Sequence, residues 1–514
     1  MRARRPPPVP VHPAFPIQPL LPDLRASLIA QPRLVLEAPP GAGKTTQVPL
    51  ALLDAPWRAG GRILMLEPRR VAARAAAGFM AKQLGEEVGR TVGYRIRFEA
   101  KVSATTQVEV VTEGILTRLI QDDPTLDGVA AILFDEFHER HLAADLGLAL
   151  ALDVQAQLRP DLRIVVMSAT LDGERLARFL DAPRLTAEGR AYPVTTRHFP
   201  ARRDEPATAQ LRRCVEHALA QHPGDLLVFA PGQREIADAT RALEPVIPAD
   251  VRLLPLHGEL PVEAQSAALN PDPDGKRRVV LATNVAESSV TLPGVRVVID
   301  SGLAREPRFE PNSGFSRLDT VAISQASADQ RAGRAGRVAE GWCYRLWPES
   351  QRLEPNRRAE VSQVELSGLA LELAAWGEAD LRFVDAPPRG ALAAGIDLLK
   401  SLGALDANGR ITSFGKRVLA LGTHPRLAAM LLAPTDATET ALACDLAALV
   451  EARDPLKGPR RDDVAARWQA RSMAWVTSQV PGSRRPSQVS AAGKSAITPG
   501  SPLVASSPFS MSAR

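Results

Sequence analysis

The chain has 514 residues, of which 45% are hydrophobic and 24% are charged. This length predicts about three or four domains, and the composition excludes a chain that is disordered throughout. The net charge is +5, from 63 Lys and Arg residues against 58 Asp and Glu residues. Six of the basic residues and none of the acidic residues lie after Asp463, so residues 1–463 carry a net charge of −1. The positive excess belongs to the C-terminal end and gives little support for nucleic-acid binding by the rest of the chain.

The cysteines and the start of the chain indicate a cytoplasmic protein. Cys214, Cys343 and Cys444 lie far apart and form no CxxC pair, which favours a reducing compartment. The sequence contains no run of about 18 apolar residues, so we expect no membrane-spanning helix. The basic start, MRARRPPPVP, continues into prolines and does not resemble a secretory signal.

Short apolar runs alternate with longer helical stretches, a pattern typical of βαβ units around parallel sheets that are buried on both faces. The expected strands of a first α/β unit are Leu34–Leu36, Ile63–Leu66, Ala130–Phe134 and Ile164–Met167. Those of a second unit are Leu226–Phe229, Val251–Leu256, Val279–Leu281, Val295–Ile299 and Trp342–Leu346. Beyond about residue 355, apolar residues at helical spacing predict helices over Leu366–Trp376 and Ala391–Leu402.

The same patterns divide the chain into segments. Residues 1–17 form a Pro-rich lead-in. The two α/β units span residues 18–188 and 189–352, and a mainly helical segment spans 353–470. Residues 471–514 are rich in Ser, Pro, Gly, Ala and Val without a helical or strand period, so we expect this tail to be disordered.

A phosphate-binding loop follows the first expected strand, in the sequence APPGAGKTT at residues 38–46. Gly41 and Gly43 allow the backbone to curl so that its N–H groups point at phosphate oxygens. Lys44 is expected to reach the β and γ phosphates, and the Thr45 hydroxyl to ligate Mg²⁺. The expected nucleotide-binding residues are Gly41, Ala42, Gly43, Lys44, Thr45, Thr46 and Asp135, with ATP and Mg²⁺ as cofactors.

Two adjacent carboxylates end the apolar run Ala130–Phe134. An apolar strand that ends in carboxylates is the usual partner of a phosphate-binding loop. We expect Asp135 to hold Mg²⁺, directly or through water, and Glu136 to orient and deprotonate the attacking water. His138 has no second ligand at metal spacing, so we expect it to link the nucleotide site to the domain cleft by hydrogen bonds.

Arginines recur every three residues in the second unit, in the sequence QRAGRAGR at residues 330–337. On a helix, residues three apart lie on one slowly drifting face. We expect Arg334 and Arg337 to reach across a cleft and stabilise the transition state, and Gln330 to position the water. ATP would then bind between the two units, and its hydrolysis would open and close the cleft.

Nine linked motifs resemble those of the superfamily 2 DEAH/RHA helicases, and the resemblance covers residues from about 17 to 470. They are APPGAGKTT (38–46), EPRRVAAR (67–74), VGYRIRFE (92–99), TEGIL (112–116), DEFHER (135–140), SAT (168–170), LLVFAPGQREI (226–236), ATNVAESSVTLPGV (282–295) and QRAGRAGR (330–337). Phe137 replaces the family's usual Ala, which is similar to a bacterial branch of the family.

The resemblance implies an α/β fold of two tandem RecA-like domains, followed by a winged-helix-like region at 353–425 and part of a helical ratchet-like domain at 426–470. It implies that Arg305–Ile323 forms a strand-separating β-hairpin, and that Ser168 and Thr170, with His138, couple hydrolysis to domain movement. The implied nucleic-acid contacts are Arg69, Thr112, Glu113, Gly114, Pro231, Gly232, Thr283 and Asn284. Such contacts reach sugar and phosphate and carry little sequence specificity.

The implied function is 3′ to 5′ helicase or translocase activity on single strands, with RNA favoured over DNA. Three positions depart from relatives: Ala38 replaces a Gly, Pro293 an acidic residue near the nucleotide, and Leu269 lies where an aromatic often stacks on the base. Because relatives continue beyond the helical region, we expect a frameshifted or early-ended reading frame after about residue 471. The alternatives are an ATPase without productive unwinding, or a non-functional truncated product. The sequence predicts no oligomeric state.

Overall fold

The computed structural model describes residues 15–39, 41–169, 173–187, 192–287, 292–310, 314–377, 380–451 and 467. The chain forms two compact units, Met1–Ala428 and Ala429–Arg514, and each is described by itself. The prediction for the tail at 471–514, most of the lead-in and the expected coupling residue Thr170 lie outside the described residues. Within the described part, no helix is long and apolar enough to cross a membrane.

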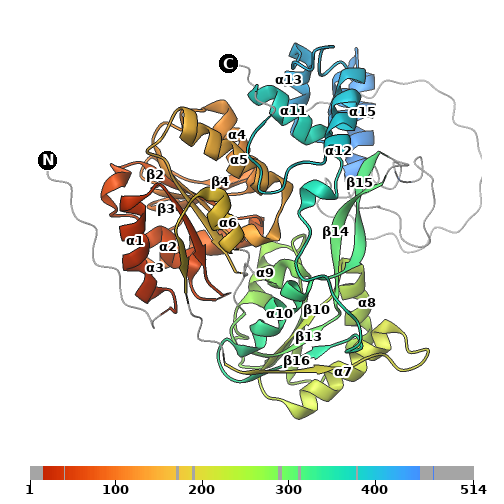
Figure 1. The fold of residues 1–514 in the computed structure, drawn as a ribbon. Coiled ribbons are helices and arrows are strands. Elements are labelled where there is room, and N and C mark those ends of the chain that lie inside the picture. Colours follow the sequence, from red (N-terminus) through yellow and green to blue (C-terminus); the bar gives the residue numbers. More distant parts are fainter. Residues whose placement is uncertain are drawn as a thin grey trace, which may run out of the picture. The chain divides into compact units, whose positions relative to one another are not determined.

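The first α/β domain contains an eight-stranded sheet in the order β4-β3-β5-β2-β6-β7-β1-β8 (Figure 1). All neighbouring strands are parallel except β3 and β4, which are antiparallel. The strands are β1 Arg33–Glu37, β2 Arg62–Leu66, β3 Val92–Ile96, β4 Glu99–Lys101, β5 Val108–Val111, β6 Val129–Phe134, β7 Arg163–Ser168 and β8 Arg184–Thr186. The sequence predicted β1, β2, β6 and β7 and missed the other four.

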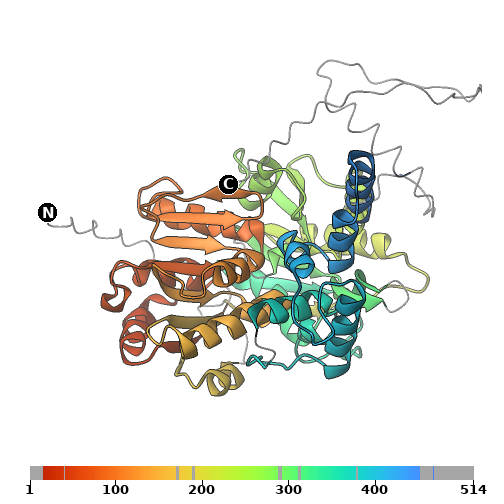
Figure 2. The same ribbon diagram turned by 90° about the horizontal axis from the view of Figure 1, so that it is seen from above.

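Helices cover both faces of this sheet (Figures 1 and 2). They are α1 Leu21–Ala30, α2 Lys44–Ala51, α3 Arg70–Gln83, α4 Glu113–Asp122, α5 Leu142–Gln157 and α6 Gly173–Leu180. Alternate residues of each strand point to opposite faces, so Ile63 and Met65 of β2 pack with α1–α3, whereas Leu64 and Leu66 pack with α4–α6. Burial of both faces explains why the central strands have continuous apolar sequences.

The second α/β domain contains six parallel strands in the order β11-β12-β10-β13-β16-β9. They are β9 Val194–His198, β10 Asp225–Phe229, β11 Val251–Leu256, β12 Arg277–Ala282, β13 Val295–Asp300 and β16 Gly341–Arg345. Its helices are α7 Ala207–Gln221, α8 Gln233–Leu243, α9 Val262–Leu269 and α10 Gln325–Gly333. The five strands predicted for this domain are all present, and the edge strand β9 was missed.

An antiparallel hairpin joins β13 to α10. Its strands are β14 Leu303–Glu310 and β15 Phe315–Ala322, paired from Leu303 with Ala322 to Glu310 with Phe315. The hairpin contacts the segment that follows the second domain, because the Phe309 N–H donates to the Gln363 carbonyl at 2.8 Å. The structure thus contains a hairpin where the sequence predicts one, at Arg305–Ile323.

The rest of the described chain is mainly helical. Within the first unit, α11 Ser367–Trp376, α12 Arg389–Ser401 and α13 Ser413–Ala420 accompany a single antiparallel bridge between Leu405 and Ile411. The Thr412 hydroxyl caps α13 by accepting from the Gly415 N–H. Helix α14, Pro425–Leu432, crosses the boundary between the units, and α15, Ala437–Glu451, belongs to the second unit. The predicted fold class, two RecA-like domains followed by a mainly helical region, is confirmed.

Candidate nucleotide and nucleic-acid sites

The phosphate-binding loop connects β1 to the first residue of α2. Gly41 and Gly43 adopt φ values of +85° and +95°, which residues with a Cβ atom rarely adopt. A Cβ at Gly41 would lie 3.3 Å from the Arg337 guanidinium, so this loop lies against a residue of the second domain. Helix α2 begins at Lys44 and directs its positive N-terminal end toward the loop.

Lys44 lies at the centre of a buried acidic group. Its Nζ atom is 3.0 Å from Glu136 Oε1 and 3.9 Å from Asp135 Oδ1. Burial alone would lower the pKa of Lys44, but the carboxylates of Glu136, Asp135 and Glu67 raise it above its usual value. Lys44 is therefore a permanent cation at the point where the loop would receive phosphates.

Asp135 and Thr45, the residues predicted to hold magnesium, lie in direct contact. The Thr45 hydroxyl donates to Asp135 Oδ2 at 2.5 Å, and the Glu136 N–H donates to Asp135 Oδ1 at 2.8 Å. Burial raises the pKa of Asp135, and Lys44 opposes this shift. An aligned hydroxyl and carboxylate are the hard oxygen ligands that Mg²⁺ prefers, so these residues fit the predicted ion.

Glu136 is held in a strained backbone conformation with φ +50°. Such a conformation costs about 1–3 kcal/mol and persists only when its surroundings fix it. Here the bonds to Lys44 and Asp135 do so. Burial would raise the pKa of Glu136, but Lys44 and then His138 more than offset this and lower it. Glu136 is thus kept as a carboxylate that can accept a proton.

His138 connects Glu136 to the end of β7. Its Nδ1 atom accepts from the Ala169 N–H at 3.3 Å and lies 3.5 Å from Glu136 Oε2. Burial lowers the pKa of His138, and the buried Nε2 atom has no hydrogen-bond partner in the described structure. Ser168, one of the predicted coupling residues, is fully buried beside this contact. Ala169 of the SAT segment therefore contacts His138, the side chain predicted to link the nucleotide site to the domain cleft.

The arginines at 331, 334 and 337 separate into two roles. Arg331 is 1% exposed and bonds to Glu287 and Asp300 at 2.8 Å each, so it is a structural ion pair within the second domain. Arg334 lies in the short helix Arg334–Gly336 and donates to the Glu287 carbonyl at 2.8 Å. Arg334 and Arg337 are the two arginines for which the sequence predicts the transition-state role.

Arg334 and Arg337 form a buried cationic pair that faces the carboxylates of the first domain. Burial and the charge of Arg337 lower the pKa of Arg334, whereas Glu136 raises it. Burial likewise lowers the pKa of Arg337 to about 10, against the attraction of Glu136. Within the described residues, Nε and Nη2 of Arg337 and Nε2 of Gln330 are buried without hydrogen-bond partners. Arg337 is a buried cation with unpartnered donors in the described part of the chain, and Arg334 adds a second positive charge beside it, a combination suited to a polyanion such as triphosphate.

The predicted nucleic-acid residues lie at the carboxyl ends of parallel strands, as the nucleotide residues do. Arg69 follows β2, Thr112 and Glu113 follow β5, and Gly114 lies in the first turn of α4. In the second domain, Pro231 and Gly232 follow β10, and Thr283 and Asn284 follow β12. This edge is where α/β sheets bind ligands.

Arg69 already has protein partners. Its guanidinium makes a two-pronged contact with Glu139, at 2.8 and 2.9 Å, and donates to the Asn284 carbonyl of the second domain. Its side chain is 15% exposed. Gly232 is similarly close to other groups, since a Cβ there would lie 2.7 Å from Arg305. Arg69 thus links two predicted nucleic-acid segments across the domain interface.

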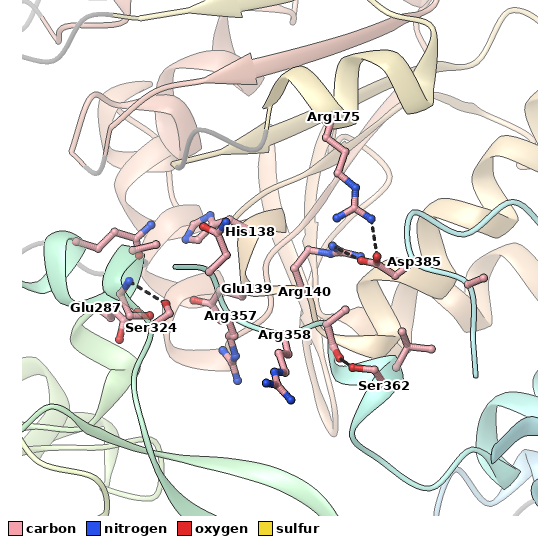
Figure 3. Close-up of a pocket in the computed structure, with 17 residues that line it drawn as sticks. His138, Glu139, Arg140, Arg175, Glu287, Ser324, Arg357, Arg358, Ser362 and Asp385 are labelled. Carbon is pink, nitrogen blue, oxygen red and sulfur yellow. Dashed lines mark hydrogen bonds and ion pairs between the residues drawn. The ribbon is translucent and has the colours of Figure 1, made fainter. Parts of the chain in front are cut away.

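A cavity of about 420 Å³ lies beside this interface (Figure 3). Residues of both α/β domains line it, including His138 and Gln330, together with residues 356–359, 361–362 and 385–386 of the following segment. In Figure 3, Arg140 and Arg175 both point at Asp385, at 2.7 and 2.5 Å. These ion pairs connect the DEFHER segment, through Arg140, and helix α6, through Arg175, to the linker before α12.

Sequence reasoning missed several of these charged residues. Glu139 and Arg140 belong to the DEFHER string, so their position next to Glu136 was an available signal. Glu67 is fully buried and influences the pKa of both Lys44 and Arg69; its signal was its place directly after β2. Asp385 is far from its partners in sequence, and no local pattern marks it.

Models of known families match three parts of the chain. Residues 24–179 match the DEAD/DEAH box helicase, residues 209–339 match the helicase conserved C-terminal domain, and residues 395–422 match the winged helix of the helicase associated domain (HA2). The chain therefore carries regions similar to both helicase domains of DEAD/DEAH box helicases and to their HA2 winged helix. The predicted resemblance is confirmed, and the two large matches coincide with the two α/β domains.

Relatives from Escherichia coli resemble both the sequence and the structure. The chain is 44% identical over 468 residues to the ATP-dependent RNA helicase HrpB of strain K12, an alignment covering 90% of this chain and 57% of that protein. It matches the crystal structure of the DEAH/RHA helicase HrpB with a TM-score of 0.81 and 43% identity, covering 91% of this chain and 61% of that one. A crystal structure of the DExH-box NTPase HrpB gives a TM-score of 0.76 at 43% identity, covering 91% and 59%. The chain spans about three fifths of these relatives.

Proposed function

We propose that this chain is an ATP-dependent RNA helicase or translocase that moves 3′ to 5′ along a single strand. The observation that carries the proposal is the placement of Lys44 and Glu136 on one domain opposite Arg337 on the other, with Arg337 against the phosphate-binding loop. The 44% identity to an ATP-dependent RNA helicase supports the choice of reaction and of substrate class.

In this proposal the residues of the first domain bind ATP and activate the attacking water. The N–H groups of residues 41–46 and the Lys44 ammonium bind the phosphates of ATP. Thr45 and Asp135 hold Mg²⁺, which neutralises phosphate charge when bound. Glu136 accepts the proton of the attacking water; Lys44 holds the pKa of this carboxyl low, so it is ionised before the nucleotide binds.

The residues of the second domain complete the site. Gln330 positions the water through its amide, and Arg334 and Arg337 stabilise charge that develops on the transferred phosphoryl group. Because these residues belong to a different domain from Lys44 and Glu136, the full set exists only while the two domains are close together. Hydrolysis of ATP and release of its products would then open the cleft between the two domains.

The strand-binding part of the proposal uses the remaining predicted residues. Arg69, Thr112, Glu113, Gly114, Pro231, Gly232, Thr283 and Asn284 contact the sugar–phosphate backbone, and His138, Ser168 and Thr170 transmit changes at the phosphate site to these contacts. Residues 353–425 act as a winged-helix-like domain and 426–470 as part of a ratchet-like domain. We place the activity in the cytoplasm, which agrees with the three free cysteines.

The test is ATP hydrolysis by the full chain with and without single-stranded RNA or DNA of the same base sequence. We expect RNA to increase kcat more than DNA does. Hydrolysis that neither nucleic acid changes would contradict the substrate assignment, and no hydrolysis at all would contradict the reaction.

A further inference from the structure

His141 lies between two carboxylates directly after the DEFHER segment. Its Nδ1 atom is 3.0 Å from Glu113 Oε1, and its Nε2 atom is 3.3 Å from Glu139 Oε2. Its side chain is 23% exposed and that of Glu139 is 7% exposed, so water screens these contacts only partly. Each ring nitrogen therefore faces an acidic oxygen from a different element, α4 or the short helix Phe137–Glu139.

Only a protonated ring satisfies both contacts. A neutral imidazole has one N–H donor and one acceptor nitrogen, and carboxylates only accept. If the ring were neutral, one of the two carboxylates would face the lone pair of the unprotonated ring nitrogen and could not accept a hydrogen bond from it. Burial alone would lower the pKa of His141, but Glu113 and then Glu139 outweigh it and raise the pKa above its usual value.

The remaining charged neighbours do not remove this preference. Arg357, from the segment after the second domain, acts against protonation of His141, but its Nε atom is itself paired with Glu306 of β14 at 3.0 Å. Glu360, from the short helix Glu360–Ser362, accepts from the adjacent Leu142 N–H at 2.8 Å. The balance of charge around the ring is acidic.

The two carboxylates lead to functionally different segments. Glu139 lies three residues after Glu136 and holds the Arg69 guanidinium, which in turn reaches the Asn284 carbonyl. Glu113 begins α4 and belongs to the TEG segment. His141 thus joins the catalytic carboxylate loop to three segments predicted to contact nucleic acid.

We propose that protonated His141 is a positioning residue that couples nucleic-acid binding to ATP hydrolysis. A bound strand fixes Arg69, Glu113 and Asn284, and the bridge through His141 and Glu139 transmits this restraint to the loop that carries Glu136. The inference rests on the proposed function and adds to it a pH dependence. Coupling is present while His141 is charged, and it is lost as pH rises through the raised pKa.

The test measures the stimulation of ATP hydrolysis by a single-stranded RNA of about 20 nucleotides, from about pH 6 to about pH 9, in the full chain. We expect stimulation in the wild type to decline as pH rises. His141→Gln, which cannot bridge two carboxylates, should reduce stimulation about tenfold at every pH, within the range of about 5- to 150-fold typical of coupling between sites. His141→Lys, which stays charged, should retain stimulation and remove the decline.

His424→Gln is the matched control, because His424 Nε2 also contacts a carboxylate, that of Glu365 at 3.1 Å, outside these segments. It should keep the wild-type pH profile. If His141→Gln is insoluble, His141→Lys and a direct NMR titration of the ¹³C-labelled His141 ring still decide the matter. A ring already neutral at pH 6, or a His141→Lys profile that declines as the wild type does, overturns the inference.

The outcomes separate this inference from the function on which it rests. A wild type that hydrolyses ATP without any response to RNA overturns the proposed function, and the coupling falls with it. A wild type that RNA stimulates, together with a His141→Gln variant that keeps full stimulation and the same pH profile, overturns the coupling alone.

Discussion

Lys44 Nζ and Glu136 Oε1 form a buried ion pair at 3.0 Å, which joins the phosphate-binding loop directly to the predicted general base. The lysine side chain is 4% exposed and that of the glutamate 2%, so both charges of the pair are withdrawn from water. Nucleotide phosphates would compete with Glu136 for the same ammonium. Nucleotide binding would then free the Glu136 carboxylate to act on the attacking water.

Glu136→Gln should lower kcat by about 10²–10⁴-fold, the usual contribution of a general base, because an amide cannot accept the proton. The near-equal shape of Gln should leave ATP binding intact. Stopped-flow binding of a fluorescent ATP analogue and steady-state hydrolysis give the two quantities. Near-normal turnover in this variant would remove Glu136 from its proposed role.

Lys44→Ala should instead weaken nucleotide binding. The variant loses the phosphate contact and leaves Asp135 and Glu136 adjacent without their cation, so their mutual repulsion opposes an anionic ligand. Isothermal titration with ATP measures the loss. Unchanged ATP affinity in a folded Lys44→Ala variant would contradict this account.

Arg337→Ala should lower the rate of hydrolysis and Arg331→Ala should lower stability, although both remove an arginine of the same segment. Arg337→Ala should lower kcat by about 10³–10⁵-fold, the range attributed to arginine fingers, with little change in Tm. Arg331→Ala should cost about 3–5 kcal/mol of unfolding free energy, because Asp300 is left buried without its cation. Denaturant unfolding and ATP hydrolysis of both variants decide the matter, and equal stability losses would contradict the division of roles.

Gly43→Ala should impair nucleotide binding through the backbone. Gly43 has φ +95°, and an added Cβ would lie 3.0 Å from Phe15, so the substitution adds both strain and a clash. The control is Gly78→Ala in α3, where a Cβ meets nothing within 4 Å. That change should stabilise the helix by about 0.5–1 kcal/mol. ATP affinity equal in the two variants would be inconsistent with the loop geometry.

Apolar runs bounded by turn residues predicted β1, β2, β6 and β7 of the first sheet and five strands of the second, because these strands have nearly continuous apolar sequences. The short strands β4 and β8 and the partly exposed β9 were missed, since their sequences carry no continuous apolar run. The buried strands β3 and β5 were also missed, because Gly93 and Arg95 interrupt the apolar sequence of β3 and Glu109 interrupts that of β5. The residues proposed to bind the nucleotide could be selected from the sequence because the loop, the strand end and the arginine segment each carry a local pattern, and the structure brings them close together. The structural role of Arg331 could not, because its partners Glu287 and Asp300 are distant in sequence. The same holds for the contacts of Asp385 with Arg140 and Arg175 and for the contact of His141 with Glu113.

The measurement that tests the central claim most directly is strand separation of an RNA duplex with a 3′ single-stranded tail, alongside the same duplex with a 5′ tail, by the full chain with ATP. The account predicts that the 3′-tailed duplex is unwound only with hydrolysable ATP, that the 5′-tailed duplex is not, and that Glu136→Gln unwinds neither. A chain that separates neither duplex while hydrolysing ATP, or that prefers the 5′ tail, would contradict it.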